Sequence, residues 1–280
     1  MSPIPKPWPA SDLGVSLTSL IHHVMSLEQP IQEEIYAYVQ AHLPQDEWYS
    51  SYFDFVTDAD LRERLAEEFK AARSVYKLFR GIDASGWWLR AQVRIQILQY
   101  ASIYEAVIHH VLFDRLGEEE SVRRLVEYPR LVRIDIPQHK QIALEKALDH
   151  DSKVIIPTYQ GIGRTDVNKV RFDEKVSCAV GLQLIEQDLG DELISTYEAR
   201  NAIHLHAELR KNLRYELDMA RTACRRLAPF RSQLVASMQA RGLLLQAVVA
   251  ETSIDDEGYH HHSPDPPMRQ CFIAKAAPGG

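Results

Sequence analysis

Residues 87–116, WWLRAQVRIQILQYASIYEAVIHHVLFDRL, decide the fold. Apolar residues recur in this stretch at steps of three and four, the spacing that aligns side chains on one face of an α-helix. That face consists of Val93, Ile97, Ala101, Tyr104, Ile108 and Val111. The pattern predicts one long buried helix, with Asp83 or Ser85 as the N-terminal cap and Gly117 as the stop.

Helical periodicity continues on both sides of this segment. Residues 58–80 combine strong helix formers with apolar residues at helical spacing, with Asp58 or Asp60 as the cap and Gly81 as the end. Further helices are predicted over 172–186 and 190–201, with Asp173 and Asp191 as their caps. After residue 206 the pattern predicts one long helix, bent by Pro229, whose apolar stripe is Leu209, Leu213, Leu217, Ala220, Cys224 and Leu227. The fold class is therefore all-α.

The region 118–171 interrupts the helical pattern. Two short β-branched runs, LVRIDIP and KVIIPTYQ, are each broken by a proline and predict a small β-hairpin or an extended loop. A short helix is expected between them, with Pro137 near its start. The stretch QGIGRTDVNKV is expected to be a loop, and its two glycines do not match a phosphate-binding fingerprint.

These patterns suggest a helical domain over residues 58–250 that carries the insertion at about 118–171. Residues 1–57 form an N-terminal helical extension, in which residues 12–43 are expected to be two helices split near Pro30. Residues 251–280 are polar and rich in proline and glycine, which predicts a flexible tail.

Composition narrows the class of protein. The chain has 280 residues, 45% hydrophobic and 25% charged, which is typical of a soluble globular protein. Three widely spaced cysteines without a CxxC pair predict reduced thiols and a cytoplasmic protein. Neither a signal peptide nor an apolar run long enough for a membrane span is recognisable. The net charge of −7 argues against non-specific coating of nucleic acid, although a local basic site remains compatible with it.

Residues 200–206, RNAIHLH, are the main candidate for chemistry. In a continuous helix, His204 would lie near the face of Arg200 and His206 would point away from it. Asparagine disfavours helix interiors and favours helix ends, so a break near Asn201 would let either histidine turn back toward Arg200. Histidine transfers protons near neutral pH, and arginine binds phosphate oxygens through its planar donors. Such a pair can promote attack of an RNA 2′-hydroxyl without a metal or other cofactor.

This stretch resembles the R-x(4–6)-H motif of HEPN-domain proteins, whose usual form begins Arg-Asn. Arg200 and Asn201 match that pair, and His206 fits the spacing, whereas His204 has too few intervening residues. The earlier helix that contains Glu105 resembles the second helix of the family. The resemblance covers about residues 58–245 and implies a HEPN-like helical bundle with an inserted loop or hairpin.

The resemblance also implies a function. Many HEPN proteins are metal-independent endoribonucleases of toxin–antitoxin or antiviral defence systems, and they act as dimers in which two motifs face each other. Carried over, Arg200 would bind the scissile phosphate, His206 would be the general acid or base, and Asn201 would orient one of them. His204 and Glu105 are second-rank candidates. The expected partners are an RNA substrate, a second copy of the chain and a possible antitoxin or defence protein, with no membrane.

Basic residues after the motif bear on the substrate. Arg210, Lys211 and Arg214 are expected to contact RNA phosphates. A solvated helix face is the alternative for this charge run, and it is the preferred interpretation for Arg225 and Arg226. Tyr197 is expected to fill the core rather than to stack on a base. The sequence therefore predicts a ribonuclease, and leaves open a non-catalytic helical module that binds RNA or protein.

The other histidines suggest weaker alternatives. The pairs at 22–23 and 109–110 lie in apolar segments and are expected to be packing or satisfied core histidines. A third reading, a metal-dependent hydrolase, would combine His204 and His206 with the tail residues His260–His262 and Cys271. No spacing among these residues supports a closed tetrahedral site, so no metal is expected.

Overall fold

The computed structural model describes residues 26–148 and 153–244. These residues are mostly helical, and a single two-stranded antiparallel sheet accompanies the helices that they form. In chain order the elements are α2 (Gln29–Ala41), α3 (Asp46–Tyr52), α4 (Ala59–Gly81), α5 (Gly86–His109), the π-helix η1 (His110–Arg115), α6 (Glu120–Val126), β1 (Glu127–Arg133), α7 (Gln138–Leu148), β2 (Thr158–Arg164), the 3₁₀-helix η2 (Val167–Lys169), α8 (Phe172–Gly181), α9 (Gln187–Asn201), α10 (Leu205–Lys211), α11 (Leu217–Arg225) and α12 (Leu227–Ala240).

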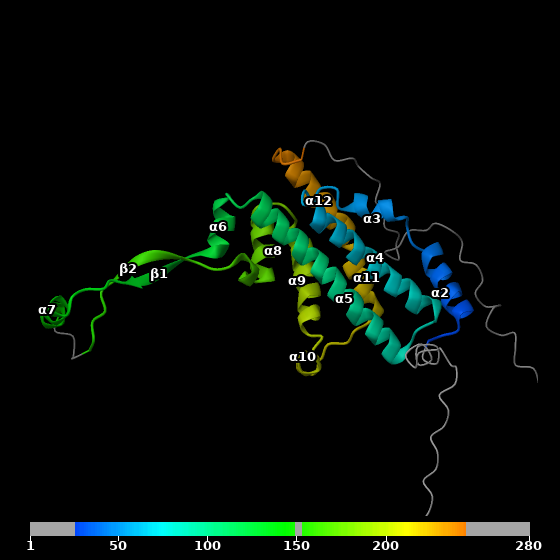
Figure 1. Cartoon of the computed structure of the whole chain (residues 1–280), viewed down its shortest axis with the longest axis horizontal. Coiled ribbons are helices and arrows are strands. Elements are labelled where there is room, and N and C mark those ends of the chain that lie inside the picture. Colours follow the sequence, from blue (N-terminus) through cyan, green and yellow to red (C-terminus); the bar gives the residue numbers. More distant parts are fainter. Residues whose placement is uncertain (1–25, 149–152, 245–280) are drawn as a thin grey trace, which may run out of the picture.

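Helix α5 is the centre of the bundle and packs against α4, α8, α9 and α11 (Figure 1). Every residue of its predicted apolar face is at most 1% exposed, so the prediction of a long buried helix is confirmed. The helix does not stay α-helical to its end, because residues 110–115 widen into a π-helix before Gly117. Single turns of π-helix are rare and are often found at functional sites.

Helix α4 begins and ends close to the predicted positions. The Asp58 carboxylate accepts a hydrogen bond from the Leu61 amide at 2.9 Å, which confirms Asp58 as the cap. Gly81 is the last helical residue, but the residue that reverses the chain is Asp83, in the left-handed conformation. Asp83 therefore ends α4 rather than capping α5. Ser85 occupies the N-cap position of α5 without forming a side-chain capping bond.

The prediction of one long helix after residue 206 is wrong. Helix α10 ends after Lys211, because Asn212 adopts the left-handed conformation with φ of 49°. The Asn212 amide bonds to the Leu209 carbonyl, and the Leu213 amide bonds to the Glu208 carbonyl, which is the Schellman motif of helix ends. Leu209 is 79% exposed and does not belong to the buried stripe, which begins only in α11.

Helices α8 and α9 agree with the prediction in position but not in their caps. The N-cap residues are Arg171 and Glu186, so Asp173 lies inside the first turn of α8 and Asp191 lies beyond the first turn of α9. Helix α8 is also shorter than expected. It ends at Gly181, and Gln183 then takes the left-handed conformation.

The predicted hairpin exists, and it projects from the side of the bundle as an arm with α7 at its tip (Figure 1). Strand β2 includes residues 160–164, which were expected to be a loop, and pairs Gly163 with Tyr128. A Cβ atom on Gly163 would lie 2.7 Å from Cζ of Tyr128, so any other residue would displace the tyrosine ring that covers this strand. The two glycines thus indicate close cross-strand packing rather than a turn.

The segment before α4 contributes to the main core. Tyr49, Tyr52 and Phe53 are almost fully buried and pack around Phe69 of α4. Pro30 lies in the first turn of α2. The earlier of the two helices expected over 12–43 falls largely outside the described residues, as does the predicted tail over 251–280.

Candidate functional site

Arg200 and Asn201 are the last two residues of α9. The chain leaves the helix at Ala202 and starts α10 at Leu205, so the helix does break next to Asn201. Nη1 of Arg200 donates a hydrogen bond to Oδ1 of Asn201 at 2.9 Å. This bond fixes the asparagine amide group beside the guanidinium.

Tyr197 connects this helix end to Glu105. Its ring lies under the guanidinium of Arg200, with 5.2 Å between Cζ and the ring centroid, and stacks on Phe172 at 4.3 Å. Its hydroxyl donates to Oε1 of Glu105 on α5 at 3.2 Å. A polar chain therefore runs from Glu105 through Tyr197 to Arg200 and Asn201. Tyr197 packs against the core, as expected, but it also orients two of the candidate site residues.

The Tyr197 phenol is held in its protonated form. Burial raises the pKa of Tyr197, the nearby Glu105 carboxylate raises that pKa further, and Arg200 opposes the change. The hydroxyl is consequently a permanent hydrogen-bond donor to Glu105 at neutral pH.

The two motif histidines are separated from this polar chain. His204 is the N-cap residue of α10 and His206 lies in the first turn, and both side chains are exposed. Within the described part of the chain, neither forms a hydrogen bond or an ion pair with Arg200. The structure thus joins Arg200, Asn201 and Glu105 through Tyr197, and leaves both histidines exposed to solvent.

Helix α10 is held in place by two ion pairs. Arg94 of α5 pairs with Glu208, and Lys211 pairs with Glu198 of α9 at 3.3 Å. All three residues predicted to contact RNA, Arg210, Lys211 and Arg214, are exposed, and Lys211 is also engaged in an ion pair.

Two cavities adjoin the polar chain. The first, of about 390 Å³, is lined by Glu105, Tyr197 and Asn201, together with Lys169 and Arg171 from the segment that returns from the arm. The second, of about 330 Å³, lies between α5 and α8 and shares Glu105 and Asn168 with the first. Together the cavities extend from the end of α9 to the end of α5.

The second cavity contains two residues that the sequence did not single out for chemistry. Lys175 of α8 is 2% exposed, and its Nζ lies 3.3 Å from Nδ1 of His109. Burial lowers the pKa of His109 and of Lys175. The neighbouring His110 is a satisfied core residue, as expected, because it contacts Asp114 at 2.9 Å and Thr57 at 3.3 Å. His109 also packs, with its ring 4.9 Å from that of Phe113, but its hydrogen-bond partner is the buried Lys175. The spacing of four residues between Glu105 and His109 was the available signal for a shared site.

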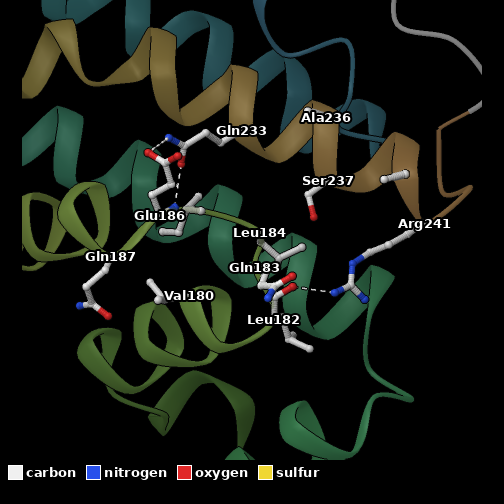
Figure 2. A pocket seen from close by; sticks show the side chains of 12 residues that line it. Val180, Leu182, Gln183, Leu184, Glu186, Gln187, Gln233, Ala236, Ser237 and Arg241 are labelled. Carbon is white, nitrogen blue, oxygen red and sulfur yellow. Dashed lines mark hydrogen bonds between the residues drawn. The ribbon is translucent and has the colours of Figure 1, made fainter.

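A larger cavity lies elsewhere, between α12 and the connection from α8 to α9 (Figure 2). Its volume is about 630 Å³. Its charged side chains are engaged: Glu186 accepts a hydrogen bond from Gln233, and Arg241 donates to the Leu182 carbonyl at 2.6 Å. Because these hydrogen bonds already occupy the charged groups, we interpret this cavity as a packing gap between helices rather than as a reactive site.

The described residues contain no group of three or more His, Cys, Asp or Glu residues placed to hold a metal ion, and His260–His262 and Cys271 of the metal alternative fall outside them. None of the described helices has the length and apolar character needed to cross a bilayer.

Comparison with known proteins gives no further assignment. No family model matches the sequence, and neither the curated proteins nor the solved structures contain a significant match.

Proposed function

We propose that this protein is a metal-independent endoribonuclease of the HEPN type, acting in a toxin–antitoxin or antiviral defence system. The observation that supports this function is the polar chain Glu105–Tyr197–Arg200–Asn201 at the end of α9, next to a cavity lined in part by basic residues. In this proposal Arg200 binds the scissile phosphate through its planar donors. Asn201 orients that phosphate or the histidine, and His206 transfers the proton.

The exposed position of His206 agrees with an active site completed by a second subunit. In a two-fold dimer the two RNAIHLH segments would face each other, and each would contribute to one cleft. Apolar side chains beside the motif support such a contact. Ile95, Leu98 and Leu209 are exposed, and the Arg94–Glu208 pair joins the two helices that carry them. Light scattering should show a dimer, and an active monomer at micromolar concentration would exclude this arrangement.

Incubation with total RNA in EDTA tests the proposal against its rivals. Retained cleavage in EDTA is expected, and it should disappear in Arg200→Ala. Cleavage that EDTA abolishes would instead indicate metal-dependent hydrolysis. RNA binding without cleavage would indicate the non-catalytic module, in which Arg210 and Arg214 serve binding alone.

A further inference from the structure

The buried lysine Lys175 has an unusual environment. Lysine is almost never fully buried unless it is paired with an opposite charge. Among the described residues, no carboxylate comes within 4 Å of the Lys175 ammonium. Its neighbours are the His109 ring nitrogen at 3.3 Å and the Phe113 ring, whose centroid lies 5.9 Å away. Burial of this ammonium therefore carries a desolvation cost that no ion pair with a carboxylate offsets.

The lysine lies at the wall of a cavity. Lys175, His109 and Glu105 line the same space of about 330 Å³, together with Asn168 and Ser102. The Glu105 carboxylate lies one helical turn before His109 on α5, and the Asp114 carboxylate also lines the cavity, so donors and acceptors share this space. Oε1 of Glu105 already accepts from the Tyr197 hydroxyl, which leaves Oε2 to accept from a ligand. A ligand with an anionic group and a hydroxyl group would pair with both kinds of group.

The charges that face the pair come from the end of α5 and from η1. Glu105 and Asp114 raise the pKa of His109, whereas Lys175 and His110 lower it. Only Glu105 counteracts the effect of burial on Lys175. Asp114 is bonded to His110 and is thus occupied. A bound anion would supply the missing counter-charge of the lysine.

We propose that the cavity between α5 and α8 binds a ribose phosphate, with the phosphate at Lys175 and His109 and a ribose hydroxyl at Glu105. Phosphate binding rests only on the geometry of this cavity, whereas assigning the ligand as a segment of RNA rests on the proposed function. The shared residues Glu105 and Asn168 would place this phosphate next to the one held by Arg200 and Asn201. The cavity is thus a subsite for a nucleotide that adjoins the cleaved bond.

Proton uptake provides a signature that a structural role would not produce. Burial lowers the Lys175 pKa in the free protein, and an anion bound beside the amine favours its charged form. Binding should therefore raise the Lys175 pKa and draw protons from solution at a pH close to the pKa of the free amine. Adenosine 3′-monophosphate is titrated calorimetrically at a series of pH values from about 8 to about 10, in two buffers of different ionisation enthalpy, and these titrations measure the uptake while the phosphate is already a dianion.

Two lysine variants complete the experiment. Lys175→Met keeps the unbranched stem and removes the charge, and it should weaken binding of adenosine 3′-monophosphate roughly tenfold or more. Its proton uptake should disappear, while its thermal stability should be unchanged or higher because a buried charge is gone. Lys140→Met, on the exposed helix α7, is the matched control and should bind as the wild type does.

The outcomes separate this inference from the proposed function. Lys175-dependent binding in a protein that cleaves no RNA would support the subsite and refute the ribonuclease. Cleavage that requires Arg200, together with binding unaffected by Lys175→Met, would refute the subsite alone. Equal affinity for adenosine, which lacks the phosphate, would also overturn the inference. If Lys175→Met fails to fold, the wild-type protein decides, because saturable binding without proton uptake at any pH of the series contradicts the role of Lys175.

Discussion

Arg231 tests whether the segment before α4 is part of the bundle. Its side chain is 6% exposed and lies on α12, yet its partners precede α4 in the chain. Nε donates to the Tyr52 carbonyl at 2.8 Å, and a terminal nitrogen donates to Asp54 at 3.0 Å. The guanidinium also lies 5.7 Å from the centroid of the Tyr52 ring. Arg231 therefore links the end of α3 to α12, the last described helix.

The expected cost of Arg231→Met follows from these two bonds. A hydrogen bond from a charged group contributes about 1.5–3 kcal/mol, so two bonds set an upper range of about 3–6 kcal/mol. Asp54 is 33% exposed, so solvent screens part of that bond, and methionine retains the apolar stem. A loss of about 3 kcal/mol in the free energy of unfolding is expected, which corresponds to a fall in Tm of roughly 6–12 °C.

Thermal and urea unfolding of the variants provide the assay. Asp54→Asn and the double variant complete a cycle in which the two single effects should not add, because both remove the same ion pair. Arg64→Met is the control, since its pair with Glu67 is exposed on both sides and should contribute less than about 1 kcal/mol. A loss below about 0.5 kcal/mol for Arg231→Met, or full additivity in the cycle, would refute the anchoring of α3 by α12.

Three further results are expected. Gln183→Gly should raise the free energy of unfolding by about 1 kcal/mol in urea titrations, because Gln183 has φ of 56° at the end of α8, where glycine carries no steric cost; a destabilised variant would contradict this. Arg210→Ala combined with Arg214→Ala should raise the KM for a defined RNA and flatten its salt dependence, with a smaller effect on kcat; unchanged values would place the RNA elsewhere. His206→Ala should abolish cleavage and His204→Ala should reduce it less; a dead His204→Ala with an active His206→Ala would reverse their roles.

The helices that pack against the core were predictable, because their apolar faces repeat at helical spacing. Helix α5 is the clearest example, with each of its predicted face residues buried. The end of α10 was not predictable in this way. Leu209 fits the apolar spacing of α11, and only the left-handed backbone of Asn212 shows that the two helices are separate. Asparagine tolerates that conformation but does not require it.

The arm shows a second limit of predicting structure from the sequence. Glycines in QGIGR resemble a loop in the sequence, yet the stretch is a strand whose glycines lie beneath Tyr128 and Val132. Cross-strand packing depends on a register that a single strand does not reveal.

The candidate site was predictable only in part. Arg200 and Asn201 form a recognisable pair, and Glu105 stood out beside the apolar face of α5. The link through Tyr197 and the approach of Lys175 to His109 join residues 92 and 66 positions apart in the chain. Neither contact leaves a local pattern in the sequence, because both depend on how α5, α8 and α9 pack.

The chemical nature of the RNA ends tests most directly the proposal that this protein is a metal-independent endoribonuclease. One defined RNA is incubated with the wild-type protein and with Arg200→Ala in EDTA, and the ends of the products are analysed. Attack by the RNA's own 2′-hydroxyl predicts a 2′,3′-cyclic phosphate and a 5′-hydroxyl from the wild type, no products from Arg200→Ala, and resistance of a substrate that is 2′-deoxy at the cleaved position. Products with 5′-phosphates, equal cleavage by Arg200→Ala, or an intact RNA in every reaction would contradict the account.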